Sequence, residues 1–363
     1  MDSIKEGKAS IKAGNGVFFN PKMKKLRDMS VLFVKALNKK QPASFLDCTA
    51  ATGVRAIRYA KEAGIRNITT IDMNKDAYKS MRKNLSANNV KAKALNMSIQ
   101  EYANTTAEKF DIIDLDPFGT PSPHVFDVMK ISKDGTVLMI TATDTAVLCG
   151  AHEAACMKTY GSKPMHNELC KESGIRILLN FISRNAAVFN FGSEPLLSIS
   201  DMHYMRVFVR LSAGAKEALA SIKENGFACF CGSCRNFSLS KGIAPKLSPK
   251  CANCSKAMEP YGPMWLGKLQ SKEMIGKMLK LVNDPYEGEK ELRMMQGELD
   301  MPFFYSIPRM TKSLHMSSVS PEAVRMRLEK MGIAATRTQF DKDALKTTGT
   351  VSEVIKAIRP NRV

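Results

Sequence analysis

The stretch "FDIIDLDPFGTP", Phe110 to Pro121, decides the fold class of this chain. Its apolar first half is typical of a buried strand in a parallel sheet. Asp116, Pro117 and Phe118 follow at the point where that strand ends. Open α/β sheets bind their ligands at the carboxyl ends of their strands. We therefore expect the acid and the ring to face a ligand.

Strand and helix patterns alternate on both sides of this stretch. Apolar runs, "ASFLD", "ITTIDM", "KALNM", "FDIIDLD" and "GTVLMITAT", are separated by helical patterns near residues 54–63, 74–87, 100–108 and 124–131. A helix near 175–189 precedes "EPLLSIS" and "HYMRVFVRLS", which we interpret as a closing strand pair. Such alternation predicts right-handed crossovers and a parallel sheet. The fold class is therefore α/β, with the seven strands of a Rossmann-like methyltransferase sheet.

The composition narrows the class of partner and the compartment. A formal net charge of +19 favours a polyanion such as nucleic acid. Residues 1–40 alone carry ten Lys or Arg and three acids. No window approaches the length of an apolar membrane span, and the start resembles neither a secretory signal nor a transit peptide. We expect a cytoplasmic protein with no membrane contact and no obligate protein partner.

The first strand and helix suggest a nucleoside site. Asp47 ends the strand, Gly53 stands in a loop of small residues, and Arg55 follows on the helix. The pattern G-x-G-x-x-G is absent, which argues against a pyrophosphate ligand. Asp72, after the next strand, is spaced to bind ribose hydroxyls. S-adenosylmethionine is the natural candidate cofactor, whereas the plain alternative is a strand end with a capping Asp.

Asp116 and Pro117 suit the methylation of a purine amino group. Such a nitrogen is a poor nucleophile, so a carboxylate must hold it in line and accept its proton, helped by a carbonyl that the proline orients. Phe118 would stack on a base taken out of its helix. The acid favours guanine, whose N1 and N2 are donors. The alternative is a simple strand-to-turn junction with Phe118 in the core.

The cysteines indicate a structural metal site. Cys231 and Cys234 form one C-x-x-C pair, and Cys251 and Cys254 form a second pair 16 residues later. Four thiolates at this spacing predict a zinc ribbon with a closed coordination shell. We interpret Cys229 as a strand residue. The remaining cysteines, Cys48, Cys149, Cys156 and Cys170, are predicted core residues.

The character of the chain changes near Phe227 and again after Gly267. We therefore predict three parts: residues 1–225 as the methyltransferase domain with its basic N-terminal segment, 226–266 as the zinc ribbon, and 267–363 as a smaller α+β domain. Helices are expected near 271–282 and 321–331 in the last part.

Taken together, these segments resemble the Trm1-type tRNA (guanine-26-N2) methyltransferases. The resemblance rests on "EGKASI", "VFFNPKMKKLRD", "FLDCTAATGVRAIRYAKE", "DIIDLDPFGTPSPHVFDV", "TATDTAVLCG", "HYMRVFVR", the cysteine pairs, "GPMWLGKL" and "TRTQFDKDALKTTG". It implies transfer of one or two methyl groups from S-adenosylmethionine to N2 of guanine 26 in tRNA.

The resemblance also implies roles for single residues. Asp116 would be the catalytic acid, and Phe118 and Phe18 would sandwich the guanine. Arg27, Arg55 and Asp72 would contact the cofactor, and the basic C-terminal domain would grip the tRNA backbone. Two positions depart from the family pattern: Leu26 replaces an Asn, and Ser98 with Ile99 replaces an Asp-Ala pair near the adenine. The Ser98 hydroxyl is still able to accept a hydrogen bond from the adenine amino group, although a neutral acceptor is weaker than a carboxylate.

The same residues are compatible with two alternative functions. One is amino methylation of another substrate, adenine N6 or a protein glutamine. The other is a zinc-containing RNA-binding protein that has the fold without catalysis.

Overall fold

The computed structural model describes residues 3–14, 16–37, 43–201, 203–283 and 286–359. Three charged residues of the basic N-terminal segment, Asp2, Lys39 and Lys40, lie outside these ranges. Among the described residues, no helix has the length and apolarity needed to cross a membrane.

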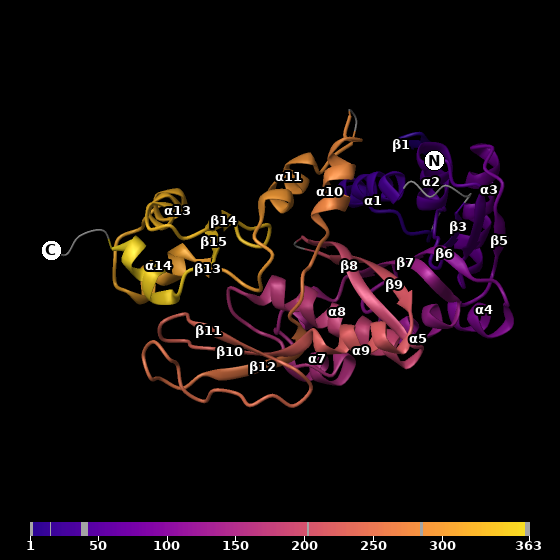
Figure 1. The fold of residues 1–363 in the computed structure, drawn as a ribbon. Coiled ribbons are helices and arrows are strands. Elements are labelled where there is room, and N and C mark those ends of the chain that lie inside the picture. The colour runs from indigo at the N-terminus through magenta and orange to yellow at the C-terminus, as the bar shows by residue number, and fades with distance from the viewer. Residues whose placement is uncertain (1–2, 15, 38–42, 202, 284–285, 360–363) are drawn as a thin grey trace.

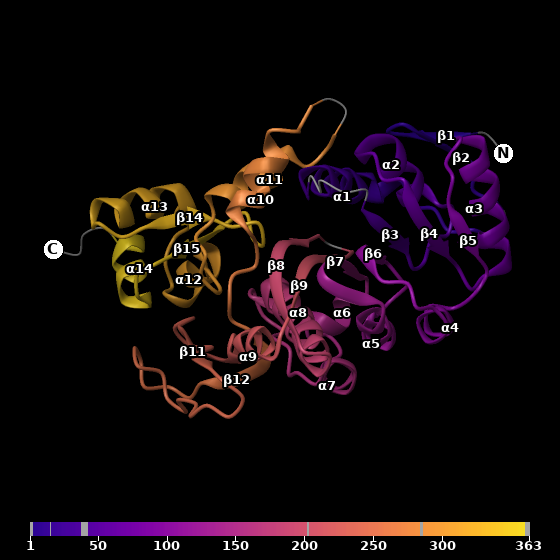
Figure 2. The same cartoon turned by 45° about the vertical axis from the view of Figure 1, so that its right-hand side comes forward.

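A seven-stranded sheet forms the centre of the molecule, as predicted, in the order β5-β4-β3-β6-β7-β9-β8. The pairs from β5 to β7 are parallel, and β9 runs antiparallel to both β7 and β8. The sheet is seen from two directions in Figures 1 and 2. Its strands are β3 Ser44–Asp47, β4 Asn67–Ile71, β5 Lys93–Leu95, β6 Phe110–Leu115, β7 Ser132–Ala142, β8 Phe191–Ser200 and β9 Met205–Ala213.

The predicted helices of this part are also present. Their bounds are α2 Val54–Ala63, α3 Lys75–Ala87, α4 Ile99–Thr105, α5 Ser122–Lys130 and α8 Cys170–Val188. Sequence reasoning missed several shorter elements and one long helix, namely β1 Ile4–Glu6, β2 Ala9–Ile11, η1 Pro21–Met23, α1 Lys24–Leu37, α6 Thr145–Leu148, α7 Glu153–Tyr160 and α9 Ala215–Lys223. The basic N-terminal segment is thus partly a buried helix, because apolar residues of α1 pack against α2.

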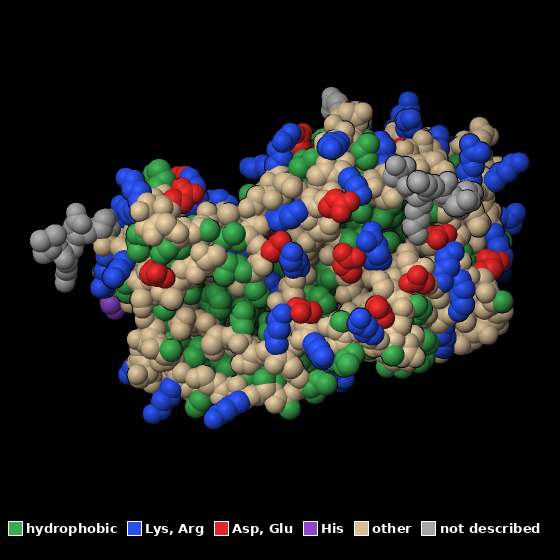
Figure 3. Space-filling view, in the orientation of Figure 1, with side chains coloured by type: hydrophobic (Ala, Val, Ile, Leu, Met, Phe, Trp, Pro, Cys, Tyr) green, Lys and Arg blue, Asp and Glu red, His purple; other side chains and the backbone are tan. Residues whose placement is uncertain are grey.

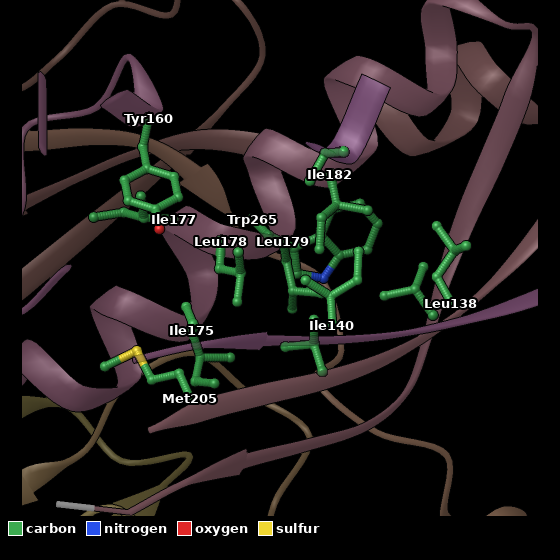
Figure 4. Close-up of a cluster of buried hydrophobic side chains, with 14 of the residues drawn as sticks. Leu138, Ile140, Tyr160, Ile175, Ile177, Leu178, Leu179, Ile182, Met205 and Trp265 are labelled. Atoms are coloured by element: carbon green, nitrogen blue, oxygen red, sulfur yellow. The ribbon is translucent and has the colours of Figure 1, made fainter. Parts of the chain in front are cut away.

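Alternate residues of the strands supply two cores on opposite faces of the sheet. Ile113 and Leu138 belong to one core with α4, α5 and α8, whereas Ile112 and Val137 belong to the other with α1, α2 and α3. This is the period-2 alternation of a sheet covered on both faces. Figure 4 shows the first core, where Leu138 and Ile140 of β7 lie near Ile175, Leu179 and Ile182 of α8, with Trp265 among them.

The strands of the predicted zinc ribbon form a separate three-stranded sheet in the order β11-β10-β12. Cys229 lies in β10, which confirms its interpretation as a strand residue. Trp265, at the end of β12, packs into the first core of the large sheet. The strand bounds are β10 Asn225–Phe230, β11 Phe237–Lys241 and β12 Glu259–Trp265.

The C-terminal region contains helices that belong to two different cores. α10 Lys272–Leu279 and α11 Glu289–Gly297 pack beside α1 and share the second core of the large sheet. Figures 1 and 2 both show them next to α1. The remaining elements have a small core of their own: β13 Tyr305–Ser306, α12 Ile307–Ser313, α13 Pro321–Lys330, β14 Ala335–Arg337, β15 Ala344–Thr347 and α14 Val351–Ile358. The three-part division of the chain stays a prediction.

Candidate functional site

A cavity of about 570 Å³ opens at the carboxyl ends of β3, β4 and β6. The sequence argument placed a ligand at this edge of the sheet. Residues from five separate segments of the chain meet there. The predicted residues that line the cavity are Phe18, Arg27, Arg55, Asp72, Asp116, Pro117 and Phe118.

Asp72 is held rigidly at one end of the cavity. Its carboxylate accepts hydrogen bonds from the backbone N–H of Ala51 at 2.8 Å and of Asn74 at 2.9 Å. Ala51 adopts φ 46°, so the β3–α2 loop turns its amide toward Asp72. Each carboxylate oxygen keeps a further lone pair for another donor. Asp72 is therefore oriented to accept hydrogen bonds from hydroxyl groups of a ligand.

Arg27 lines the same cavity and is fixed from behind by Glu6 of the N-terminal hairpin. Its Nε donates to Glu6 Oε1 at 2.7 Å, and its Nη2 donates to Glu6 Oε2 at 2.5 Å. Burial would raise the pKa of Glu6, but the hydrogen bond and charge of Arg27, together with Arg58, lower it. Glu6 is thus ionised, and this bidentate pair leaves the guanidinium of Arg27 little rotational freedom.

Arg55 and Asp116 form an ion pair inside the cavity. The Asp116 side chain is 18 % exposed, and its backbone N–H donates to Thr49 Oγ1 at 3.1 Å. Burial would raise the pKa of Asp116, but the charges of Arg55 and Arg206 outweigh this effect and lower it. Asp116 is therefore a carboxylate at neutral pH, ready to accept an N–H.

Two exposed phenylalanine rings stand beside Asp116. Phe118 is 75 % exposed and Phe18 is 48 % exposed, which is unusual for side chains of this size. Their ring centroids lie 4.7 Å apart with an interplanar angle of 81°, so the rings touch edge to face. A base does not fit between rings in this contact. Stacking a base between them requires one ring to turn away.

The loop that carries Phe118 is pinned to the end of β7. Gly119, at φ +73°, donates its N–H to Thr143 Oγ1 at 2.8 Å, and its carbonyl accepts from the Thr143 N–H at 2.9 Å. Thr143 and His124 both line the cavity, and sequence reasoning assigned neither of them a role. The available signal was their place in "TATDTAVLCG" and "DIIDLDPFGTPSPHVFDV", two of the segments that carry the resemblance.

Three residues predicted to bind the cofactor do not line the cavity. Asp47 is buried below it, and burial together with the charge of Asp114 raises the pKa of Asp47 to about 8. Gly53 supplies the φ of +76° at the start of α2, where a side chain would meet Met81. Ser98 caps α4 by accepting from the Glu101 N–H at 3.1 Å. A direct cofactor contact stays a prediction for all three.

The four cysteines of the two C-x-x-C pairs converge. Their Sγ atoms all lie within 4.8 Å of one another, and Cys231 and Cys254 are 3.5 Å apart, as are Cys234 and Cys251. The two turns match: Cys231 N–H donates to Asn236 O and Cys251 N–H donates to Lys256 O, both at 2.8 Å. Zn–S bonds of about 2.3 Å in a tetrahedron place sulfurs at such separations. The donor set therefore fits a structural zinc ion.

Basic side chains are distributed widely over the molecule. Figure 3 shows Lys and Arg spread over the visible face, both around α1 to α3 and over the C-terminal region, with fewer Asp and Glu between them. The net positive charge is therefore not confined to one small patch of this face.

Comparison with known proteins gives a family match along almost the whole chain. The family model described as N2,N2-dimethylguanosine tRNA methyltransferase matches residues 2–359. A tRNA (guanine(26)-N(2))-dimethyltransferase of Pyrococcus furiosus is 34 % identical, with 99 % of this chain and 98 % of that protein covered. The corresponding protein of Methanosphaera stadtmanae is also 34 % identical, over 94 % of this chain and 90 % of its own length.

One solved structure is similar in fold as well as in sequence. It is the complex of Trm1 from Pyrococcus horikoshii with S-adenosyl-L-methionine, at a TM-score of 0.90 and 31 % identity. The match covers 98 % of this chain and 99 % of that chain. The similarity therefore includes the central sheet, the small sheet with the cysteines and the C-terminal region.

Proposed function

The chain belongs to the family of N2,N2-dimethylguanosine tRNA methyltransferases, and from this premise we propose which of its residues carry the reaction. Its activity is the S-adenosylmethionine-dependent methylation of a guanine N2 in tRNA. The target we propose is guanine 26, which receives one or two methyl groups. One observation carries the assignment of residues: Asp116, Phe118, Phe18, Asp72 and two arginines line one cavity.

The cavity residues fit the cofactor at both of its polar ends. The cavity volume of about 570 Å³ lies in the range of small-molecule binding sites. Asp72 would accept the ribose hydroxyls, and Arg27 and Arg55 would bind the carboxylate of the methionine moiety. When bound, S-adenosylmethionine supplies a methyl group made electrophilic by its sulfonium. Asp47, Gly53 and Ser98 would support the site from below, through the strand ends and the helix caps.

Asp116 and Pro117 would hold the guanine amino group. The Asp116 carboxylate accepts one N2–H and the Pro117 carbonyl accepts another, which keeps the nitrogen lone pair directed at the methyl carbon. Asp116 then takes the proton that N2 loses as the new C–N bond forms. Because Asp116 is ionised at neutral pH, no earlier deprotonation step is needed.

Phe118 and Phe18 would stack on the two faces of an extruded guanine. Their exposure and their place beside Asp116 support this role. Their edge-to-face contact would open when the base enters. Base–aromatic stacking contributes about 1–3 kcal/mol per base, enough to offset much of the cost of unstacking the base from the tRNA.

We further propose that Cys231, Cys234, Cys251 and Cys254 hold a structural zinc ion. The closed set of four thiolates leaves no position for a water, so the ion would take no part in methyl transfer. The basic C-terminal domain would bind the tRNA backbone. Cytoplasmic location and the lack of an obligate protein partner belong to the same proposal.

The experiment that tests the assignment uses one purified tRNA with guanine 26 and a matched tRNA with adenine 26. Mass analysis of nucleosides after incubation with S-adenosylmethionine is expected to show N2-methylated or N2,N2-dimethylated guanosine from the first tRNA only. Methylated adenosine would support amino methylation of another substrate, and a parallel incubation with a protein fraction tests transfer to glutamine. Absence of any transfer despite tRNA binding would support the catalytically idle protein.

A further inference from the structure

A row of buried polar side chains crosses three adjacent strands below the cavity and ends at Asp116. The register places Thr141 of β7 opposite Arg206 of β9. It also places Leu115 of β6 opposite Ile140 of β7, so Asp116 and Thr141 follow in the next row. Thr141 and Arg206 come from "TATDTAVLCG" and "HYMRVFVR", which have no part in the proposed reaction.

Arg206 is the centre of this row and is completely buried. Its Nη1 donates to Thr141 Oγ1 at 2.6 Å, and its Nη2 donates to Asp114 Oδ2 at 2.7 Å. The Tyr59 hydroxyl donates to the same Asp114 oxygen at 3.1 Å. Because Thr141 accepts from Arg206, its own proton is left for another acceptor. The strand register places Thr141 beside Asp116, and Arg206 and Thr141 both favour the ionised form of Asp116, whose pKa is lowered.

The charged groups around Asp116 come from four elements. Asp47 ends β3, Arg55 and Tyr59 lie on α2, Asp114 lies in β6 two residues before Asp116, and Arg206 lies on β9. Arg55 Nη1 is 4.0 Å from Asp114, and its Nη2 pairs with Asp116. Arg206 is thus the second cation of the cluster and, unlike Arg55, does not line the cavity.

This difference matters when the cofactor is bound. Arg55 is assigned both to Asp116 and to the carboxylate of the cofactor, and a guanidinium that turns toward the cofactor leaves Asp116 with a weaker partner. Arg206 is held by its hydrogen bonds to Asp114 and Thr141 and does not line the cavity, so we expect it to keep its position. Buried polar networks of this kind fix the orientation of the side chain at their end.

We propose that Arg206 and Thr141 are positioning residues that keep Asp116 ionised and directed at the guanine amino group while Arg55 engages the cofactor. The inference rests on the proposed role of Asp116. It adds two residues that touch neither substrate nor cofactor.

The test compares Thr141→Val with Thr141→Ser and with the matched control Thr70→Val. Thr70 is a buried threonine of β4 whose hydroxyl has no hydrogen-bond partner among the described residues. Single-turnover methyl transfer to guanine 26 is measured with saturating S-adenosylmethionine between about pH 3 and pH 8, a range that begins below the ordinary Asp pKa of about 3.9 because the pKa of Asp116 is lowered. Cofactor affinity and thermal unfolding are measured for every variant.

Thr141→Val is expected to lower the rate roughly 10- to 100-fold, the value of a hydrogen bond to a charged group. The acidic limb of its pH–rate profile is expected to move to higher pH, because Asp116 loses a hydrogen-bond donor that favours its ionised form. Thr141→Ser keeps the hydroxyl and should show the wild-type rate and the wild-type acidic limb. The control Thr70→Val should match the wild type in both. Arg206→Lys, which keeps the charge but not the planar fork, should fall between wild type and Thr141→Val.

A Thr141→Val protein with the wild-type rate and pH profile would overturn the proposal. So would a lower rate with an unmoved acidic limb, or a Thr141→Ser protein as slow as Thr141→Val, since either result indicates a packing role. Failure of the wild type and of Thr70→Val to methylate guanine 26 would instead contradict the proposed function. The two failures are therefore distinguishable.

Discussion

Arg55 and Asp116 are ion-paired across the floor of the cavity, although the proposed reaction gives each of them a different partner. In the proposed reaction Asp116 accepts a hydrogen bond from the guanine amino group, and Arg55 binds the carboxylate of the cofactor. The pair therefore holds the site in order before either ligand enters. It also implies that cofactor binding releases Asp116 from its cation and makes it a stronger acceptor, since loss of an adjacent opposite charge raises a carboxyl pKa.

Asp72→Asn is expected to weaken cofactor binding. The two carboxylate oxygens of Asp72 each accept a backbone N–H. The Asn side chain has only one acceptor oxygen, so its NH₂ group would face one of these N–H donors or turn out of the cavity. We expect cofactor affinity to fall about 10- to 100-fold, as for a lost hydrogen bond to a charged group. Calorimetric titration with S-adenosylmethionine measures this.

The matched control for this prediction is Asp76→Asn, an exposed acid on the first turn of α3 that is absent from the cavity lining. The affinity of Asp76→Asn for S-adenosylmethionine should equal that of the wild type. Equal affinity of Asp72→Asn and the wild type would show that Asp72 does not hold the ribose.

Phe118→Ala is expected to impair use of the tRNA and to spare the cofactor. Loss of one stacking face costs about 1–3 kcal/mol, which is roughly 5- to 150-fold in kcat/KM for tRNA. Phe126→Ala is the control, because Phe126 is also an exposed phenylalanine but does not line the cavity. If both variants lose the same activity, Phe118 has no specific contact with the base.

Removal of zinc is expected to destabilise the small sheet without abolishing cofactor binding. Cys251→Ser should bind less than one zinc per chain, whereas Cys229→Ser, in the neighbouring strand, should retain the ion. Zinc content is measured by atomic absorption, and stability by thermal unfolding. A Cys251→Ser protein with full zinc content and unchanged unfolding would contradict the four-thiolate site.

Asp47 provides a test of the electrostatics below the cavity. Burial and the charge of Asp114 raise its pKa to about 8, so the group is protonated in the fold and ionised in the unfolded chain between about pH 4 and pH 8. The unfolded state then binds fewer protons, and the contribution of Asp47 to stability falls as pH rises through this window.

Asp47→Asn cannot ionise, so its unfolding free energy should decrease less between pH 5 and pH 8 than that of the wild type. Urea unfolding at several pH values measures the two slopes. Parallel curves for the two proteins would show that Asp47 is already ionised in the fold.

The sheet was predictable because its parallel strands from β3 to β6 are short, apolar and each followed by a helical pattern. "FDIIDLD" and the glycine-poor loop after Asp47 also placed the cavity correctly, since the carboxyl ends of neighbouring parallel strands share one edge. Phe118 was correctly expected outside the core, where it is 75 % exposed. The convergence of the cysteines follows from their spacing.

Other features depend on contacts between distant segments and have no local pattern. The ion pair of Arg27 with Glu6 joins α1 to a hairpin of three-residue strands, too short to show alternation. The row from Arg206 to Thr141 depends on strand register, which sequence spacing does not give. The burial of Asp47 follows from the residues packed above it, so its distance from the cavity surface could not be predicted either.

The central claim is that the Asp116 carboxylate accepts the proton of the guanine amino group, and Asp116→Asn tests it most directly. The measurement is single-turnover methyl transfer to guanine 26, with cofactor and tRNA binding confirmed for the variant. We predict a rate at least about 100-fold below the wild type with both ligands still bound, because the amide is a poor proton acceptor. An unaltered rate in the variant would contradict the account.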